Sequence, residues 1–239
     1  MILMNLKLDN YMAFNDFEIN MSYPKKIVGN QLVENLLNHP NFRYRKLNIL
    51  MGSNASGKTS IGRMLMSIFN FIDKKEFINL ISHVNDTKKD AMFEVQIVVN
   101  DNFYRISSVV KGKEDGEDYT SDKFLTKVEK CEITKTDAYE KCLKRLDVKS
   151  SDGFSHDYMR ELEKVEKLSW AFEFPRDSRR VASRYIPQNE ERYLSILKNT
   201  LQALDPLITD VEKVSEVKDA YVIYLGNEQI MIKNGNIVG

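Results

Sequence analysis

The sequence is poor in the residues that build metal centres and crosslinks. Its 239 residues include only two cysteines and three histidines. Cys131 and Cys142 are too far apart in the sequence to form a C-x-x-C pair. With only three histidines in addition, we do not expect a structural zinc site. We therefore expect two free thiols in a reducing cytosol.

The chain also lacks an excess of charge of either sign and any long apolar run. Lys plus Arg and Asp plus Glu each number 35, so no global field attracts nucleic acid or an anionic membrane, and such binding would need a local patch. Residues 1–7 lack the basic start and long apolar run of a signal peptide. No run of about 18 apolar residues occurs. We expect a cytoplasmic, soluble protein without membrane association, built as one large domain or slightly more.

What the chain does contain is a phosphate-loop pattern. Residues 52–59 read Gly-Ser-Asn-Ala-Ser-Gly-Lys-Thr, which fits G-x-x-x-x-G-K-[ST]. The apolar stretch Leu47 to Met51 before it predicts a buried strand, and Ser60 to Ile72 after it has the apolar spacing of a helix. A strand, a glycine loop and a helix in this order predict binding of a nucleoside triphosphate.

Each residue type in the loop has a chemical task. Gly52 and Gly57 let the backbone N–H groups turn toward phosphate oxygens, and the following helix adds the positive end of its dipole. Lys58 can reach the β- and γ-phosphates, and Thr59 offers a hydroxyl to Mg²⁺. The predicted binding residues for ATP and magnesium are Gly52, Ser53, Asn54, Ala55, Ser56, Gly57, Lys58, Thr59, Ser60 and Gln188, with Thr59 as the metal ligand.

Gln188 enters this set because it follows a predicted strand, where a glutamine could meet Mg²⁺ or the attacking water; it could equally open the next helix. A phosphate-loop ATPase also needs an apolar strand that ends in Asp. The nearest approach is Ile97 to Asp101, but Phe103 starts a matching strand at once, which favours a hairpin. Phe14 could border an adenine or pack in the core.

A local basic cluster could contact phosphate or nucleic acid, or form a solvated face. It consists of Arg176, Arg179, Arg180 and Arg184.

Hydrophobic periodicity and turn residues predict the remaining elements. Strands are expected at Ile2 to Leu8, Phe14 to Met21, Phe93 to Val99, Phe103 to Val110, Phe124 to Ile133, Val181 to Ile186, Tyr221 to Leu225 and Gln229 to Ile232. Further helices are expected at Gln31 to Leu37, Lys74 to Val84, Asp137 to Asp147, His156 to Phe172 and from Asn189 to about Asp205. This order predicts an α/β lobe with a mixed sheet, antiparallel hairpins and a helical insertion at about 137–172.

The N-terminal arrangement resembles the ATP-binding heads of the ABC/SMC-like superfamily, which includes RecF, the SMC proteins and the OLD-type ATPases. The strand pair Leu6 to Ile19 and the loop with Asn54 inside it carry this resemblance. More narrowly, the approach Arg43 to Lys46 and the loop look like those of AAA-labelled ATPases of bacterial abortive-infection and phage-defence systems. The specific match covers roughly the first 70 residues.

This resemblance implies that residues 1–239 are an ATP-binding lobe of a P-loop NTPase, with ATP and Mg²⁺ as cofactors and a role in phage defence or DNA maintenance. In the family, two heads sandwich two ATP molecules. The signature loop, the Walker B Asp-Glu pair and the switch His would then come from a C-terminal continuation, a homodimer or a partner polypeptide. Two alternatives are open: a nucleotide-sensing module without turnover, and a small-molecule kinase with an acceptor-site base and an Arg-rich lid.

Overall fold

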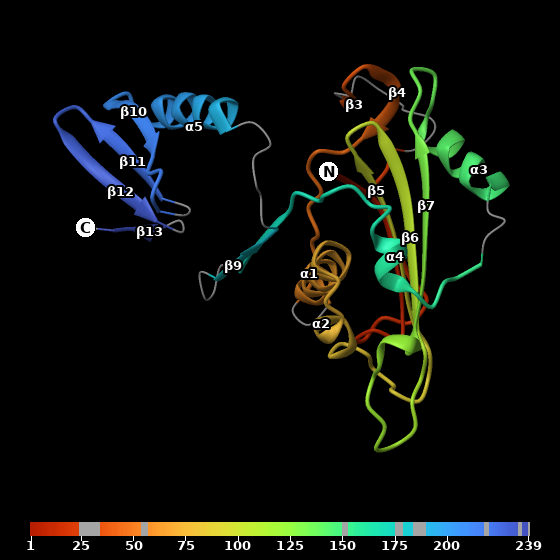
Figure 1. The fold of residues 1–239 in the computed structure, drawn as a ribbon. Coiled ribbons are helices and arrows are strands. Elements are labelled where there is room, and N and C mark those ends of the chain that lie inside the picture. The colour runs from red at the N-terminus through yellow and green to blue at the C-terminus, as the bar shows by residue number, and fades with distance from the viewer. Residues whose placement is uncertain are drawn as a thin grey trace. The chain divides into compact units, whose positions relative to one another are not determined.

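The chain divides into two units, Met1–Ser183 and Arg184–Gly239, where the sequence predicted one lobe. The computed structural model describes residues 1–23, 34–53, 57–149, 153–174, 179–183, 190–217, 220–233 and 236–238. Each unit combines helices with antiparallel sheets (Figure 1). The predicted combination of helices and antiparallel hairpins is therefore confirmed, but the predicted mixed sheet is wrong for the described residues, whose strand pairs are all antiparallel.

A five-stranded antiparallel sheet forms the centre of the first unit, in the order β2-β1-β5-β6-β7. Its strands are β1 (Ile2–Asp9), β2 (Phe17–Asn20), β5 (Ala91–Val99), β6 (Asn102–Val110) and β7 (Phe124–Glu132). The β5–β6 hairpin turns at Asn100, whose φ of 52° suits a left-handed turn position that asparagine tolerates. The strand predictions from this part of the sequence are confirmed.

Helix α1 (Lys58–Lys74) covers one face of this sheet with the apolar side that its sequence spacing predicts. Met64, Ile68 and Phe71 are fully buried in one cluster with Leu6 and Phe93 from the strands. Burying a side chain of this size contributes roughly 1.5–3 kcal/mol relative to exposure. The short helices α2 (Ile78–Ile81) and α4 (Tyr158–Leu162) add Leu80, Tyr158 and Leu162 to the same core.

The opposite face of the sheet has a second, smaller core at one end. Helix α3 (Tyr139–Lys149) and the hairpin of β3 (Glu34–Leu36) and β4 (His39–Tyr44) cover it. Met4, Phe42 and Phe103 are fully buried there. The pairing of β1 with β5 shifts register between Leu3 and Asn5. Because of this irregularity, Met4 faces the second core, whereas Leu6, two residues later, faces the first.

Two helix predictions in this unit are wrong. Within the predicted helix Gln31 to Leu37, residues 34–36 form β3, because the chain turns back at Asn38 (φ 66°) and pairs with β4. Within His156 to Phe172, only α4 is helical, and the end belongs to β8 (Ala171–Phe174), which pairs with β9 (Arg179–Ala182). The predicted insertion at 137–172 is therefore α3 and α4 with non-helical chain.

The predicted boundary between α1 and the next helix is also shifted. The helix that was expected over Lys74 to Val84 is reduced to α2, because α1 runs on to Lys74 and ends at Lys75 with φ 60°. A left-handed residue of this kind terminates a helix.

The second unit packs one helix on a four-stranded antiparallel sheet. It contains α5 (Glu190–Leu204), β10 (Ile208–Lys213), β11 (Ala220–Leu225), β12 (Glu228–Lys233) and β13 (Asn236–Ile237). Ile208, Val211 and Ile223 form its small core. The predicted hairpin around Gly226 is confirmed, since Gly226 takes a φ of 57° between paired strands.

Candidate nucleotide-binding site

Gly57 sets the geometry at the start of α1. It has φ 86° and ψ 2°, in the left-handed region, and immediately precedes the first helical residue, Lys58. The helix starts at once, since the N–H of Ile61 donates to the Gly57 carbonyl at 3.0 Å. Gly57 has no side chain that could cap the first turn of α1. In every α-helix, the N–H groups of the first turn have no hydrogen-bond partner within the helix itself. This end of α1 therefore has the donor arrangement that an anion requires.

Phe14 packs directly beneath this glycine. A Cβ placed on Gly57 would lie 3.4 Å from Cε1 of Phe14. Phe14 is 9% exposed, and its ring centroid lies 4.7 Å from that of Phe17. Of the two roles considered for Phe14, core packing is the one that the structure supports.

Lys58 folds back over the loop. Its Nζ donates to the carbonyl oxygen of Gly52 at 2.6 Å and to that of Ser53 at 2.5 Å. These bonds tie the start of the loop to the start of the helix. An ammonium group in this position can exchange carbonyl oxygens for phosphate oxygens with a small movement of its flexible stem.

The remaining predicted site residues are distributed as follows. The side chain of Thr59 is exposed, and Ser60 is half-buried, both in the first turn of α1. Asn54, Ala55, Ser56 and Gln188 lie outside the described residues. Arg176 and Arg184 of the basic cluster also lie outside the described residues, while Arg179 and Arg180 lie in β9.

The strand predicted at Leu47 to Met51 is not formed, which corrects the sequence interpretation. These residues follow β4 without joining any sheet, and the exposed fractions of Leu47, Ile49 and Met51 are 74%, 71% and 89%. A strand needs a neighbour to satisfy its backbone hydrogen bonds. None of the strands described in this chain pairs with the segment. It leaves an apolar stretch exposed directly before the loop.

Asp101 lies in the turn of the β5–β6 hairpin, as the hairpin interpretation predicts. One of its carboxylate oxygens is 3.0 Å from Nε2 of His39, and its carbonyl accepts from the N–H of Ile133 at 2.7 Å. These contacts connect three parts of the fold at the hairpin tip. Among the described residues, no group of three or more His, Cys, Asp and Glu side chains is arranged to hold a metal ion.

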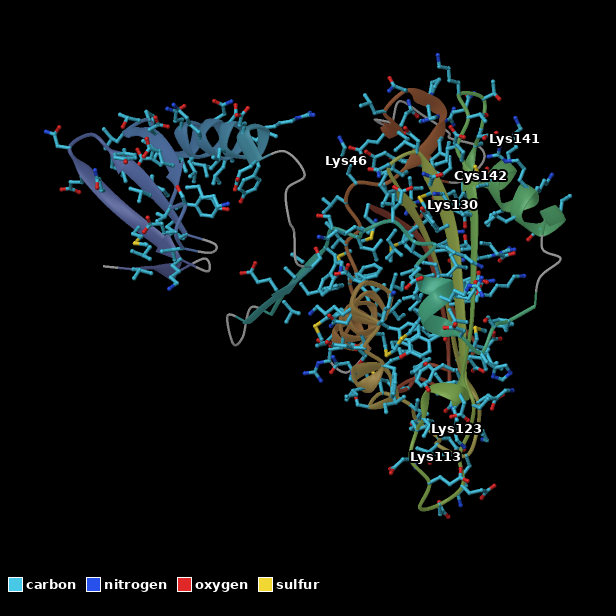
Figure 2. The ribbon with its side chains drawn as sticks, in the orientation of Figure 1. Lys46, Lys113, Lys123, Lys130, Lys141 and Cys142 are labelled. Carbon is cyan, nitrogen blue, oxygen red and sulfur yellow. The ribbon has the colours of Figure 1, made fainter. Side chains whose placement is uncertain are left out.

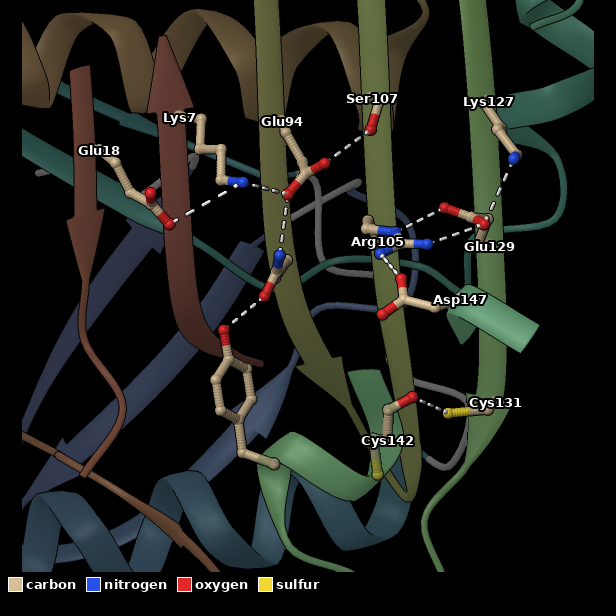
Figure 3. Close-up of polar contacts among 12 residues, drawn as sticks. Lys7, Glu18, Glu94, Arg105, Ser107, Lys127, Glu129, Cys131, Cys142 and Asp147 are labelled. Atoms are coloured by element: carbon tan, nitrogen blue, oxygen red, sulfur yellow. Dashed lines mark hydrogen bonds and ion pairs between the residues drawn. The ribbon is translucent and has the colours of Figure 1, made fainter. Parts of the chain in front are cut away.

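A second polar region, which the sequence did not predict, lies on the sheet face opposite α1 (Figure 3). Arg105 of β6 donates to both carboxylate oxygens of Glu129 on β7, at 2.6 and 3.0 Å, and to Asp147 of α3 at 2.6 Å. The Glu129 hydrogen bonds are the main reason why the pKa of Arg105 lies above its usual value. On the same face, Lys7 lies 3.7 Å from Glu94. The alternation of charged and apolar residues along β5 and β6 was the available signal for this polar face.

None of the helices in the described part of the chain combines the length and the apolar character that crossing a membrane requires. No known protein family matches the chain, and no curated protein does either.

Proposed function

We propose that this chain binds Mg-ATP through Gly52 to Thr59, as the nucleotide-binding lobe of an ABC/SMC-like P-loop ATPase. The observation that carries the proposal is the left-handed Gly57 at the start of α1, together with Lys58 folded onto the loop. A helix N-terminus and a mobile ammonium group are directed at the same short loop. That combination suits a polyphosphate better than a singly charged anion, because it supplies several N–H donors and a separate cation.

Magnesium enters the proposal through Thr59. Its hydroxyl is exposed, one residue after Lys58, so a metal bound to the β- and γ-phosphates could be reached from the same helical turn. When bound, the metal would neutralise phosphate charge. Lys58 and the first turn of α1 would hold the phosphate chain in place.

The exposed segment from Leu47 to Met51 supports a site that another strand completes. Its apolar residues are poorly suited to water, and a strand added beside them would bury several at once. We infer that this strand comes from outside the described residues, for example from a C-terminal continuation, a second copy or a separate polypeptide. The further assignment to phage defence or DNA maintenance rests on the resemblance of the N-terminal residues alone.

The test is ATP binding by the variant Lys58→Ala, measured by titration calorimetry with magnesium present. A hydrogen bond to a charged group is worth roughly 1.5–3 kcal/mol, which corresponds to about a 10–100-fold loss of affinity. Lys74→Ala is the matched control, because Lys74 is the last residue of the same helix and lies over the Trp170 ring. Equal affinity of wild type and Lys58→Ala would show that the loop is not the nucleotide site.

A further inference from the structure

The two thiols of the chain meet at the contact between β7 and α3. Cys131 is on β7 and Cys142 on α3, and both are buried, with exposed fractions of 5% and 0%. The Sγ of Cys131 lies 3.9 Å from the backbone carbonyl oxygen of Cys142 (Figure 3). Lys130, Lys141 and Cys142 mark the same end of the unit in Figure 2.

Arg145 connects the two sulfurs. Its Nη2 lies 3.7 Å from Sγ of Cys131 and 3.5 Å from Sγ of Cys142. The same nitrogen is held by the carboxylate of Asp137 at 2.6 Å and the carbonyl oxygen of Glu132 at 2.7 Å. Both thiols therefore face one fixed positive charge, which favours the charged form of whichever sulfur ionises.

The two thiols are not equivalent. The Cys142 thiol, acting as a hydrogen-bond partner, and the nearby Arg145 lower the pKa of Cys131 to about 7 in spite of burial. The hydrogen bond to Cys131 and burial raise the pKa of Cys142. One sulfur is thus set to act as thiolate and its neighbour as thiol, which is the division of roles in a reactive dithiol.

We propose that Cys131 and Cys142 form a peroxide-sensitive dithiol whose oxidised product is a disulfide joining β7 to α3. The Cys131 thiolate attacks one oxygen of hydrogen peroxide, the O–O bond breaks, and the departing hydroxide takes a proton to become water. The resulting sulfenic acid is attacked by Cys142: the S–S bond forms, the S–O bond breaks, and the hydroxide leaves as water with the Cys142 proton. The two thiols lose two electrons together, and the peroxide gains them.

Access for this small reactant is beside Arg145. The Arg145 side chain keeps 32% of its surface exposed while its Nη2 contacts both sulfurs, so the proposed entry of peroxide is alongside the guanidinium group. A larger oxidant, such as a protein disulfide, would not reach sulfurs that are covered in this way. The proposal is independent of nucleotide binding, because neither sulfur contacts the loop residues described above.

The experiment is oxidation of the reduced 239-residue chain with a small excess of hydrogen peroxide, followed by unfolding, alkylation and peptide mass analysis. We expect both thiols to disappear together and a crosslinked 131–142 peptide to appear without dimer formation. Glutathione in the same tube serves as the reference thiol. If both cysteines remain reduced, and are therefore fully alkylated, when the glutathione has been oxidised, the proposal is wrong. Sulfinic or sulfonic acid at Cys131 without the crosslink would also overturn it.

Single variants test the assigned order. In Cys142→Ser, Cys131 should stop at the sulfenic acid, which a cyclic dione reagent captures. In Cys131→Ser, Cys142 should react at least about tenfold more slowly, since its thiolate is the less populated. Arg145→Gln should slow oxidation of Cys131 if the variant keeps the wild-type circular dichroism spectrum. Faster reaction at Cys142 than at Cys131 would contradict the division of roles.

Discussion

At the scale of single residues, Gly57 carries the strongest link between sequence and site. The pattern requires a glycine here, and the structure gives the physical reason in its φ of 86°. Other residues meet a steric cost in the left-handed region. Backbone conformation therefore favours glycine at this position, while a Cβ added there would meet Phe14 only at an ordinary van der Waals distance.

We expect Gly57→Ala to destabilise the first unit by about 1–2 kcal/mol and to weaken ATP binding, because the left-handed backbone becomes strained. Gly62→Ala is the matched control. Gly62 lies inside α1, and a methyl group added there would meet no atom within 4 Å, so alanine should stabilise the helix by roughly 0.5–1 kcal/mol. Urea unfolding of both variants decides the question; equal effects would show that Gly57 is unstrained.

Thr59→Val keeps the shape of the side chain and deletes the hydroxyl. If Thr59 is the proposed ligand, nucleotide binding should lose most of its dependence on magnesium, because the metal loses a direct oxygen. The measurement is ATP affinity with magnesium and with a chelator. Thr200→Val, at an exposed helical threonine that donates to the carbonyl of Ile196, is the control. A threonine ligand is ruled out if magnesium strengthens binding equally in wild type and Thr59→Val.

At the scale of elements, Asp137 connects the turn after β7 to α3, which also packs apolar side chains on the sheet. Asp137 accepts from the N–H of Thr134 at 2.7 Å and from Arg145 at 2.6 Å, and lies 3.2 Å from Lys141. Burial alone would raise the pKa of Asp137, but the Thr134 hydrogen bonds and the two cations together lower it. The ionised carboxylate of Asp137 therefore stabilises the start of α3.

Asp137→Asn should cost about 2 kcal/mol of unfolding free energy near neutral pH, the range for a hydrogen bond to a charged group. A lowered folded-state pKa gives stability that is present above the unfolded pKa of about 4 and is lost as pH falls through the folded value. The difference between wild type and variant should therefore shrink at acidic pH. Denaturant titrations over the acid range measure it, with exposed Asp118→Asn as control. A difference that does not change with pH would contradict the assignment.

The elements also show where sequence reasoning succeeds. The β5–β6 hairpin could be predicted because alternation and the Asn100 turn are local signals. The β3–β4 hairpin could not, since its first strand has three residues and depends on pairing. For Leu47 to Met51, an apolar run predicts burial only where the fold supplies a neighbour. The contact of Cys131 with Cys142 joins a strand to a helix, and no spacing in the sequence signals it.

At the scale of the whole molecule, the two units differ in what the sequence could predict. The helix and hairpin of Arg184–Gly239 were predicted in type and place, because each is a local pattern. In Met1–Ser183 the sequence located α1 and the strands of the five-stranded sheet but not the order of those strands, because strand pairing is decided by distant residues.

Catalysis belongs to this largest scale, and we expect ATP turnover by the pure 239-residue chain to be close to background. Lys58 and α1 can position phosphates, but transfer to water also needs an oriented water and charge stabilisation on the far side of the γ-phosphate. Groups that supply these functions in other phosphate-loop enzymes are each worth on the order of a thousandfold or more in rate.

Asp101, the nearest acidic candidate in the sequence, contacts His39 at the tip of the β5–β6 hairpin. Phosphate release should therefore rise only when a polypeptide that supplies an acidic pair, and a strand beside Leu47 to Met51, is added. Fast hydrolysis by the chain alone, abolished by Lys58→Ala, would instead show a catalytic carboxylate within it, and Asp101→Asn would be the first variant to measure.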